Sequence, residues 1–375
     1  MKTNPDVIII GGGLAGLSGA IHLSKKGLKV TLIEKSEYPR HKVCGEYISN
    51  EILPYLLWLE IDVLKWNPEK ISSFEFTTQN GKIARTKLPL GGFGISRYLL
   101  DTILYQKALS NGCSILKETV TAISFANDEF SVTTPNQIIY SKLVLGAFGK
   151  RSNIDQFLER DFIIKKSPWL AVKAHYSGNI SNDTVSLHNF NGGYCGVSKV
   201  ENDIINICYL ADYATFKKYK NIEEYQKNVL YKNKHLKSVF ENSKLLFDKP
   251  LTISQLSFDK KEPVENHILM IGDSAGLIHP MCGNGMAMAI HSAKIASELL
   301  LDYHYGKITS RSLLEKNYGA QWKKHFGRRL IMGRLLASAL THKTITNIFV
   351  KVVAAMPVLL SQIIKQTHGK PIAIN

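Results

Sequence analysis

The feature that most constrains the fold is a run of glycines that directly follows a short apolar segment near the start of the chain. Residues 6–10 (Asp-Val-Ile-Ile-Ile) have the continuous β-branched character of a strand that is buried on both faces. Gly11-Gly12-Gly13-Leu14-Ala15-Gly16 follows, then a helical pattern from Leu14 to Lys26 and a second strand from Lys29 to Ile33. This order predicts a β-α-β unit whose glycine turn faces a phosphate.

Each part of this turn has a physical task in dinucleotide binding. Gly11 permits the tight turn, Gly13 lets a pyrophosphate approach the backbone N–H groups, and Gly16 lets the helix pack against the strand. Ala15 lies in the same run, and we expect it to contact the cofactor as well. Glu34 ends the second strand, where a carboxylate accepts hydrogen bonds from ribose hydroxyls. An acid at this position favours an unphosphorylated ribose, and therefore FAD or NAD over NADP.

A second glycine-rich site, toward the C-terminal end of the chain, distinguishes between FAD and NAD. Ile271-Gly272-Asp273-Ser274-Ala275-Gly276 follows the apolar strand His267–Ile271, and Gly283-Asn284-Gly285-Met286 opens a long helical pattern. Here the chain resembles the flavoprotein aromatic hydroxylase superfamily of FAD-dependent oxidoreductases, and more narrowly the geranylgeranyl reductase family. The resemblance covers about residues 5–300. It implies that Asp273 binds the ribityl chain of FAD, and that Gly285 and Met286 present their backbone near the isoalloxazine ring. As an alternative or additional role, Asp273 is an N-cap residue.

Three further cofactor contacts are implied by the resemblance. The segment Pro39-Arg40-His41-Lys42-Val43-Cys44-Gly45-Glu46 is similar to the family segment in which a Cys-Gly pair, here Cys44 and Gly45, lines the flavin. Arg97 matches the arginine that meets the cofactor at a helix start, and main-chain groups near Val120 would meet the adenine side. Cys44 follows two cations, Arg40 and Lys42, which favour a thiolate; the alternative is a small residue that fits under a ring.

The catalytic residues are less well defined by the sequence. Cys44, Tyr194 and His279 are the candidates for a proton donor. Tyr194 lies in Asn191–Lys199, where the related halogenases carry a paired-Trp motif that is missing here, so halogenation ranks low. The segment 146–152 (Gly-Ala-Phe-Gly-Lys-Arg-Ser) has Phe148 where the hydroxylases carry an Asp, which argues against direct NADPH-driven hydroxylation. No histidine or cysteine spacing fits a metal site.

Alternating apolar segments in the middle of the chain predict a second, antiparallel sheet. We therefore predict an α/β fold in which a Rossmann-like FAD-binding domain is interleaved with an antiparallel-sheet substrate domain, followed by a C-terminal helical region. The predicted boundaries are 1–70, 95–158 and 256–305 for the FAD-binding domain, 71–94 and 159–255 for the substrate domain, and 306–375 for the basic helical region.

The charge of the chain is concentrated at its C-terminal end. The formal net charge is +16, and residues 306–375 hold twelve Lys or Arg against one acid, Glu315. Lys351 and Pro357 interrupt the apolar stretch there, which favours two amphipathic helices over a membrane span. Aromatic residues suited to base stacking are sparse, so we expect contact with an anionic membrane surface and not with nucleic acid. Five scattered cysteines and the lack of a signal-peptide pattern predict a cytoplasmic protein, peripheral on the inner membrane surface if the tail binds lipid.

These observations predict an FAD-dependent oxidoreductase that acts on a lipophilic substrate, namely an isoprenoid, a quinone or a polyketide-like compound. The favoured reaction is reduction of a carbon-carbon double bond by hydride from reduced flavin, with NAD(P)H or a reduced protein carrier as the electron donor. The alternatives are a flavin monooxygenase that hydroxylates an aromatic or polyketide substrate, and a non-catalytic membrane-binding flavoprotein.

Overall fold

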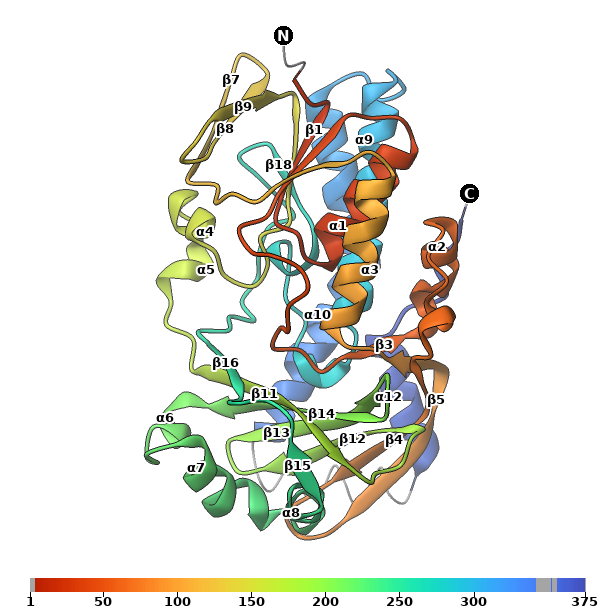
Figure 1. The fold of residues 1–375 in the computed structure, drawn as a ribbon, viewed down its shortest axis with the longest axis vertical. Helices are drawn as coiled ribbons and strands as arrows, with labels where there is room; N and C mark the ends of the chain where they lie inside the picture. Colours follow the sequence, from red (N-terminus) through yellow and green to blue (C-terminus); the bar gives the residue numbers. More distant parts are fainter. Residues whose placement is uncertain (1–3, 342–351, 353–355, 375) are drawn as a thin grey trace.

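The computed structural model describes residues 4–341, 352 and 356–374. Its upper half in Figure 1 is built on a six-stranded sheet, and its lower half on a larger sheet that is antiparallel except between β4 and β12. The order of the six strands is β17-β18-β10-β1-β2-β6. Their bounds are Val264–Glu265 (β17), Ile268–Met270 (β18), Leu143–Gly146 (β10), Val7–Ile10 (β1), Val30–Ile33 (β2) and Ser114–Leu116 (β6).

All neighbours in this sheet are parallel except the pair β17 and β18. Every residue of β1, β2, β10 and β18 is buried, because helices or loops cover both faces. The predicted helices form as α1 (Leu14–Lys25), α3 (Arg97–Ser110) and α9 (Gly285–His304), and α1 packs against the other two. The β-α-β unit expected from the glycine turn is therefore present.

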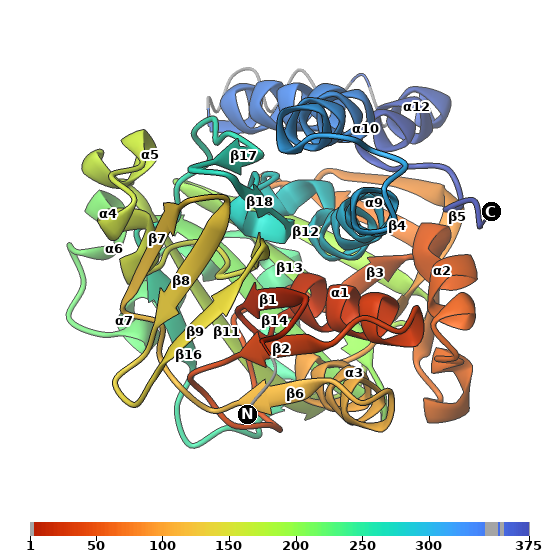
Figure 2. The same ribbon diagram turned by 90° about the horizontal axis from the view of Figure 1, so that it is seen from above.

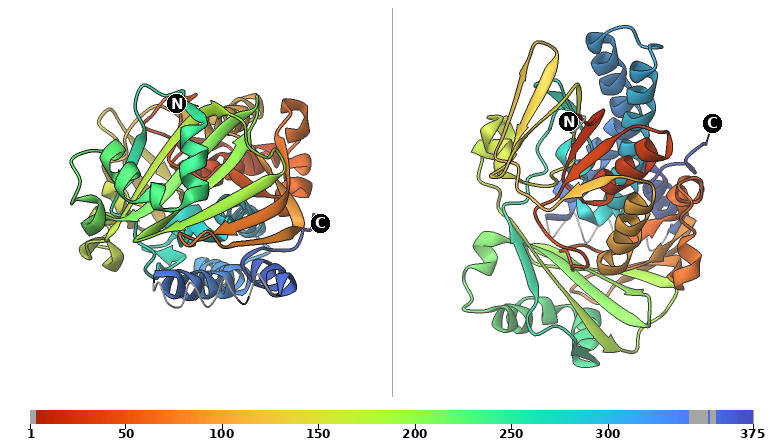
Figure 3. Two further views of the ribbon diagram at one scale, coloured as in Figure 1. Left: turned by 90° about the horizontal axis from the view of Figure 1, so that it is seen from below. Right: turned by 45° about the horizontal axis from the view of Figure 1, so that its top comes forward.

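The larger sheet has the strand order β15-β11-β14-β13-β12-β4-β5-β3, and β16 also pairs with β11. In chain order the bounds are Tyr47–Ser49 (β3), Glu69–Thr77 (β4), Ile83–Gly94 (β5), Trp169–Gly178 (β11), Thr184–Phe190 (β12), Gly193–Val200 (β13), Ile204–Asp212 (β14), Ser243–Leu245 (β15) and Leu251–Ser254 (β16). One face packs against the short helices α6 (Tyr213–Phe216), α7 (Ile222–Asn228) and α8 (Lys234–Glu241), which are green in Figure 3. The other face is turned toward the six-stranded sheet and carries an apolar cluster that includes Phe76, Leu187, Tyr194 and Leu210.

Smaller elements complete the two halves. A three-stranded sheet of β7 (Ala122–Ala126), β8 (Glu129–Thr133) and β9 (Ile138–Ser141) lies beside β10 in the upper half, followed by α4 (Asn153–Phe157) and α5 (Asp161–Ile164). Between β3 and β4 the chain forms α2 (Leu53–Trp58), which is preceded and followed by short 3-10 turns, and Glu60 takes a positive φ of 62° just after α2.

The C-terminal helices α10 (Arg311–Thr341) and α12 (Pro357–Thr367) form a layer along one side of the molecule (Figure 2). The second begins at Pro357, where the sequence predicts the break; residues 342–351 and 353–355 lie outside the described part. Within the described residues, we find no helix with the length and apolarity needed to cross a bilayer. The predicted fold class is confirmed. The domain boundaries stay a prediction. Within the predicted FAD-binding segment 1–70, the strand β3 already pairs with β5 of the larger sheet.

Candidate active site

A cavity of about 670 Å³ lies between the two sheets. Most of the cofactor-binding and catalytic residues predicted from the sequence line it, although they come from seven separate places in the chain. These are Gly11, Gly13, Ala15, Glu34, Cys44, Gly45, Arg97, Tyr194, Asp273, Gly285 and Met286. Gly16, Val120 and His279 are not among the lining residues.

The glycine turn before α1 opens toward this cavity. Gly11 has a φ of +105°, a backbone conformation that favours glycine, and a Cβ there would strike the carbonyl of Ala147. A Cβ at Gly16 would strike the carbonyl of Gly11, so Gly16 allows the helix to pack closely on the turn, as predicted. A Cβ at Gly13 would meet nothing within 4 Å. Gly13 is the N-cap of α1 and no side chain caps the helix, so its first N–H groups are free for a phosphate.

Glu34 is held at the edge of the glycine turn. Its Oε2 accepts a hydrogen bond from the Gly12 N–H at 2.8 Å, and its Oε1 accepts one from the Ser36 N–H at 2.9 Å and pairs with Arg40 at 3.0 Å. Burial alone would raise the pKa of Glu34, but the Arg40 guanidinium and the two N–H groups lower it below its usual range. Glu34 is therefore an ionised acceptor, as a ribose contact requires.

The second glycine turn lies directly against the first. Gly272 has a φ of +62°, and a Cβ there would lie 2.9 Å from the Cβ of Ala15. The helix α9 then starts at Gly285 with Asn284 as its N-cap, and no side chain caps it. Asp273 lies in a 3-10 turn before α9 and lines the cavity, so it is not the N-cap of this helix. Two uncapped helix starts thus face one cavity, which fits an extended dinucleotide with a phosphate at α1 and an anionic ring system at α9.

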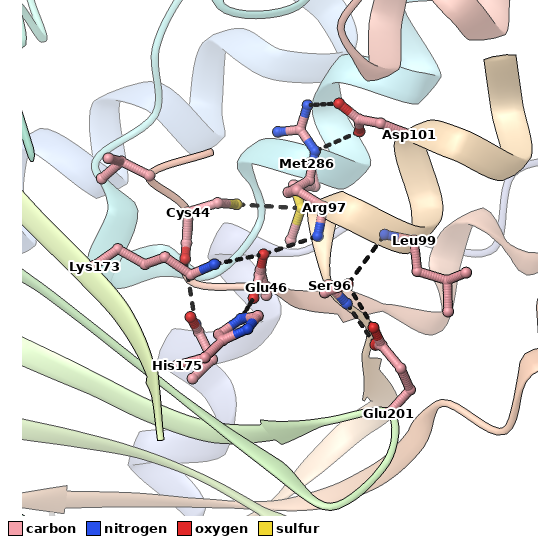
Figure 4. A network of polar contacts seen from close by, with 12 residues as sticks. Cys44, Glu46, Ser96, Arg97, Leu99, Asp101, Lys173, His175, Glu201 and Met286 are labelled. Atoms are coloured by element: carbon pink, nitrogen blue, oxygen red, sulfur yellow. Dashed lines mark hydrogen bonds and ion pairs between the residues drawn. The ribbon is translucent and has the colours of Figure 1, made fainter. Parts of the chain in front are cut away.

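The Cys44-Gly45 segment lines the cavity next to the start of α9 (Figure 4). The Cys44 Sγ lies 3.4 Å from the Met286 Sδ, and a Cβ on Gly45 would meet nothing within 4 Å. Arg97 binds Asp101 through two hydrogen bonds of 2.6 and 2.9 Å. Lys42 also pairs with Asp101, at 2.7 Å, while Arg40 is paired with Glu34. The two cations expected to favour a Cys44 thiolate are therefore occupied by carboxylates.

Glu46, which follows this segment, is the centre of a buried polar network that our sequence reasoning missed. Its side chain is fully buried, and its Oε1 accepts hydrogen bonds from the Arg97 N–H at 2.8 Å and from Lys173 at 3.1 Å. Its Oε2 lies 2.7 Å from His175 Nε2 (Figure 4). Burial would raise the pKa of Glu46, but the hydrogen bond from His175 and the charge of Lys173 lower it. Glu46 thereby ties the Cys44-Gly45 segment to β11 of the larger sheet.

Tyr194 and His279 lie at different depths. Tyr194 lines the cavity, and burial raises the pKa of its phenol well above the ordinary value, so it stays protonated. His279 packs behind it, with 5.8 Å between the two ring centroids, and neither of its ring nitrogens has a hydrogen-bond partner. Burial lowers the pKa of His279 to about 4. Tyr194 thus has access to a bound molecule, whereas His279 supports the tyrosine from the side away from the cavity.

The far end of the cavity is an apolar limb formed by the larger sheet and the C-terminal helices. Its lining residues share bulky aliphatic or aromatic side chains: Phe74, Leu88, Val185, Leu336, Leu360, Ile363 and Ile364. The tail, for which the sequence predicts only a membrane contact, therefore also shapes the site. No group of histidine, cysteine or acidic side chains that could hold a metal ion occurs in the described part of the chain.

Comparisons with known proteins agree with this geometry. Residues 6–43 match the family model described as FAD dependent oxidoreductase. An uncharacterized protein of Methanosarcina barkeri is 26% identical over 307 residues, which are 79% of this chain and 74% of that protein. Digeranylgeranylglycerophospholipid reductase 1 of Methanococcoides burtonii is 24% identical over 318 residues, 80% of this chain and 75% of that protein.

Among solved structures, the flavin-dependent brominase Bmp2 has the same fold. It superposes with a TM-score of 0.81 at 19% identity and covers 97% of this chain and 93% of its own. The predicted class, an FAD-dependent oxidoreductase related to geranylgeranyl reductases and flavin monooxygenases, is confirmed.

Proposed function

We propose that this FAD-dependent oxidoreductase reduces a carbon-carbon double bond of a lipophilic substrate, such as an isoprenoid, a quinone or a polyketide-like compound. The observation that carries the proposal is the apolar limb, which is continuous with the residues that fit FAD and is walled by Leu360, Ile363 and Ile364 of α12. An apolar cavity of this kind binds a hydrocarbon chain and excludes water from the reacting carbon atoms.

When bound, FAD supplies the hydride for such a reduction. The residues of the chain provide the remaining functions. The free N–H groups at the start of α1 bind the phosphates, and Glu34 accepts hydrogen bonds from the ribose. Asp273 binds the ribityl chain, and the N-terminus of α9 stabilises negative charge on the ring. Tyr194 holds a proton at its Oη, ready for the carbon that does not receive hydride.

The products separate reduction from oxygenation, the alternative reaction. The wild-type holoenzyme is reduced with dithionite and incubated with a panel of isoprenoid lipids, first without oxygen and then in air. We expect a product that has gained two hydrogen atoms in the absence of oxygen. A product that forms only in air and has gained an oxygen atom would contradict the proposal and establish a monooxygenase.

Tyr194→Phe tests the proton donor in this reaction. Because the variant keeps the ring but loses the hydroxyl, we expect the turnover number to fall by roughly 10²-fold or more while FAD content and substrate KM stay near wild type. Steady-state kinetics of the reconstituted enzyme measure this effect. His279→Asn is the control, because it changes the buried neighbour of Tyr194 and leaves the tyrosine hydroxyl in place. An unchanged turnover number in Tyr194→Phe would exclude the tyrosine as the donor.

We also propose that α10 and α12 dock on an anionic membrane surface from which the substrate enters. Large apolar side chains project from this layer, namely Ile331 (54% exposed), Leu335 (60%) and Val358 (71%). The cations Lys323, Lys324, Arg328 and Arg334 are exposed on the same helix, α10. Apolar side chains interspersed with cations are typical of helices that lie in the interface of an anionic bilayer.

Vesicle sedimentation tests this docking surface. We expect the double variant Leu335→Glu, Val358→Glu to bind anionic vesicles roughly tenfold or more weakly than wild type, because two apolar anchors are lost and two like charges are added. Ile164→Glu is the matched control, since Ile164 is 77% exposed on α5, away from this layer. Equal binding of wild type to neutral and anionic vesicles would contradict the proposal.

A further inference from the structure

Two polar side chains, Tyr47 and His368, interrupt the apolar limb of the cavity. Both residues line the cavity. Tyr47 belongs to the same apolar cluster as Leu88, Leu360 and Ile364, which form the limb. The rings of Tyr47 and His368 lie 6.3 Å apart, measured between their centroids, in an edge-to-face arrangement. The two polar groups are therefore neighbours in a mainly apolar part of the cavity.

Neither polar group has a hydrogen-bond partner in the described part of the chain. The Tyr47 Oη and the His368 Nε2 are both buried and unpaired. Tyr47 is only 7% exposed, so bulk solvent does not satisfy its hydroxyl. A buried polar atom without a partner costs free energy, and a ligand that pairs with the atom recovers this cost.

The hydrogen bonds of the other ring nitrogen decide whether His368 Nε2 donates or accepts. His368 Nδ1 lies 3.1 Å from the Ile364 carbonyl oxygen and 3.1 Å from the Thr367 hydroxyl oxygen. The Thr367 hydroxyl donates its own proton to the same carbonyl, at 2.9 Å, so both neighbours of Nδ1 are acceptors. Nδ1 therefore carries the ring proton. Burial lowers the pKa of His368, so the ring is neutral and Nε2 is a free acceptor.

Tyr47 provides the complementary donor. Burial raises the pKa of its phenol above the ordinary value, so the hydroxyl keeps its proton. The ring is held between two glycines, since a Cβ at Gly92 would strike it and a Cβ at Gly283 would lie 3.1 Å from its Cδ1. The chain just beyond the imidazole is fixed as well, because the Gly369 N–H donates to the buried carboxylate of Glu51. One donor and one acceptor are thus held side by side.

We propose that Tyr47 and His368 bind an uncharged hydroxyl group of the lipophilic substrate. A hydroxyl oxygen accepts the hydrogen bond from Tyr47 Oη and donates its own proton to His368 Nε2, so it satisfies both atoms. An ether or a ketone only accepts, and a charged group is disfavoured because both side chains are neutral in an apolar surrounding. Two sources have this chemistry: the alcohol of an isoprenoid, and the phenol of a quinol or polyketide ring. The inference rests on the proposed function only in taking the limb as the substrate site.

Calorimetric titration of the holoenzyme with matched pairs of probes tests this subsite without turnover. The pairs are farnesol with farnesyl methyl ether, and para-nonylphenol with para-nonylanisole; each ether accepts a hydrogen bond but cannot donate one. We expect wild type to bind the hydroxyl compound of at least one pair roughly tenfold more tightly than its ether, because only the hydroxyl pairs with the imidazole. The pair with the larger preference identifies an alcohol or a phenol as the substrate group.

Two conservative substitutions identify the groups responsible. His368→Asn keeps a donor in place of Nδ1 but has no atom in place of Nε2, so we expect it to lose the preference for the hydroxyl compound. Tyr47→Phe should bind that compound roughly fivefold more weakly, while its melting temperature stays the same or rises because the lost hydroxyl had no partner. Tyr225→Phe is the matched control, since it removes another buried phenol hydroxyl that has no partner among the described residues and lies away from the cavity.

Three results would overturn the proposal: no preference of wild type for the hydroxyl compound in either pair, an unchanged preference in His368→Asn, or binding by Tyr47→Phe that equals binding by Tyr225→Phe. None of these results depends on whether the bound compound is afterwards reduced or oxygenated. Failure of this subsite is therefore distinguishable from failure of the proposed reaction, which the products of turnover test.

Discussion

Gly13→Asp should give a well-folded protein that no longer holds FAD. Gly13 is the N-cap of α1 with a φ of −84°, and a Cβ there meets nothing within 4 Å, so the backbone accepts the new side chain. Asp is a better N-cap than Gly by a few tenths of a kcal/mol, so the thermal stability of the apoprotein should be unchanged or slightly higher. The carboxylate, however, occupies the place of a phosphate and repels it. Like charges about 4 Å apart interact by about 4 kcal/mol near a protein surface, so we expect FAD affinity to fall by at least about 100-fold.

Fluorescence titration of the apoprotein with FAD measures the change in FAD affinity, and a thermal melt measures the change in stability. Gly13→Ala is the control: it adds the same Cβ without the charge and should lower FAD affinity much less. If Gly13→Asp bound FAD as wild type does, the phosphates could not lie at the start of α1.

Glu46→Ala should be among the most destabilising single substitutions in this chain. It removes the acceptor of Lys173, His175 and the Arg97 N–H, and it leaves the Lys173 ammonium fully buried without a carboxylate. Removing one partner of a buried ion pair costs about 3–5 kcal/mol. Chemical denaturation of wild type and variant measures the difference in the free energy of unfolding.

A double variant separates the buried charge from lost packing. Glu46→Ala, Lys173→Met removes both charges, so we expect it to regain a large part of the stability that Glu46→Ala loses. If both variants were equally unstable, the uncompensated ammonium would not be the cause.

The stabilisation by Glu46 also depends on pH. Because the pKa of Glu46 is lowered in the folded protein, its contribution to stability is present above the unfolded pKa of about 4.3 and is lost as the pH falls through the folded pKa. The stability gap between wild type and Glu46→Ala should therefore narrow in acid.

The local signals in the sequence account well for the cofactor half. The glycine turns, the apolar strands and the helix Arg97–Ser110 are set by nearest neighbours along the chain, so their positions could be predicted within a residue or two. The contact between Gly272 and Ala15 joins segments more than 250 residues apart, yet each segment carries its own motif. The family resemblance predicted that these two glycine turns serve one cofactor, which the periodicity of apolar residues alone does not indicate.

The network around Glu46 could not be predicted in the same way. Glu46 and its partners Lys173 and His175 are more than 120 residues apart and belong to no shared motif. One signal was present: Lys173 and His175 are separated by two positions in an otherwise apolar strand, so both project from one buried face and require an acid. The apolar limb was missed because the apolar residues of the tail were assigned to a membrane-facing surface, whereas Leu360, Ile363 and Ile364 face inward.

The central claim is that one FAD lies extended between the two glycine turns and reaches the Cys44-Gly45 segment. Hydrogen–deuterium exchange of the wild-type apoprotein, with and without FAD, tests this claim most directly. We predict that FAD slows exchange in three separate segments, at residues 11–16, 44–46 and 285–288. Protection confined to residues 11–16, with unchanged exchange at the start of α9, would contradict the account.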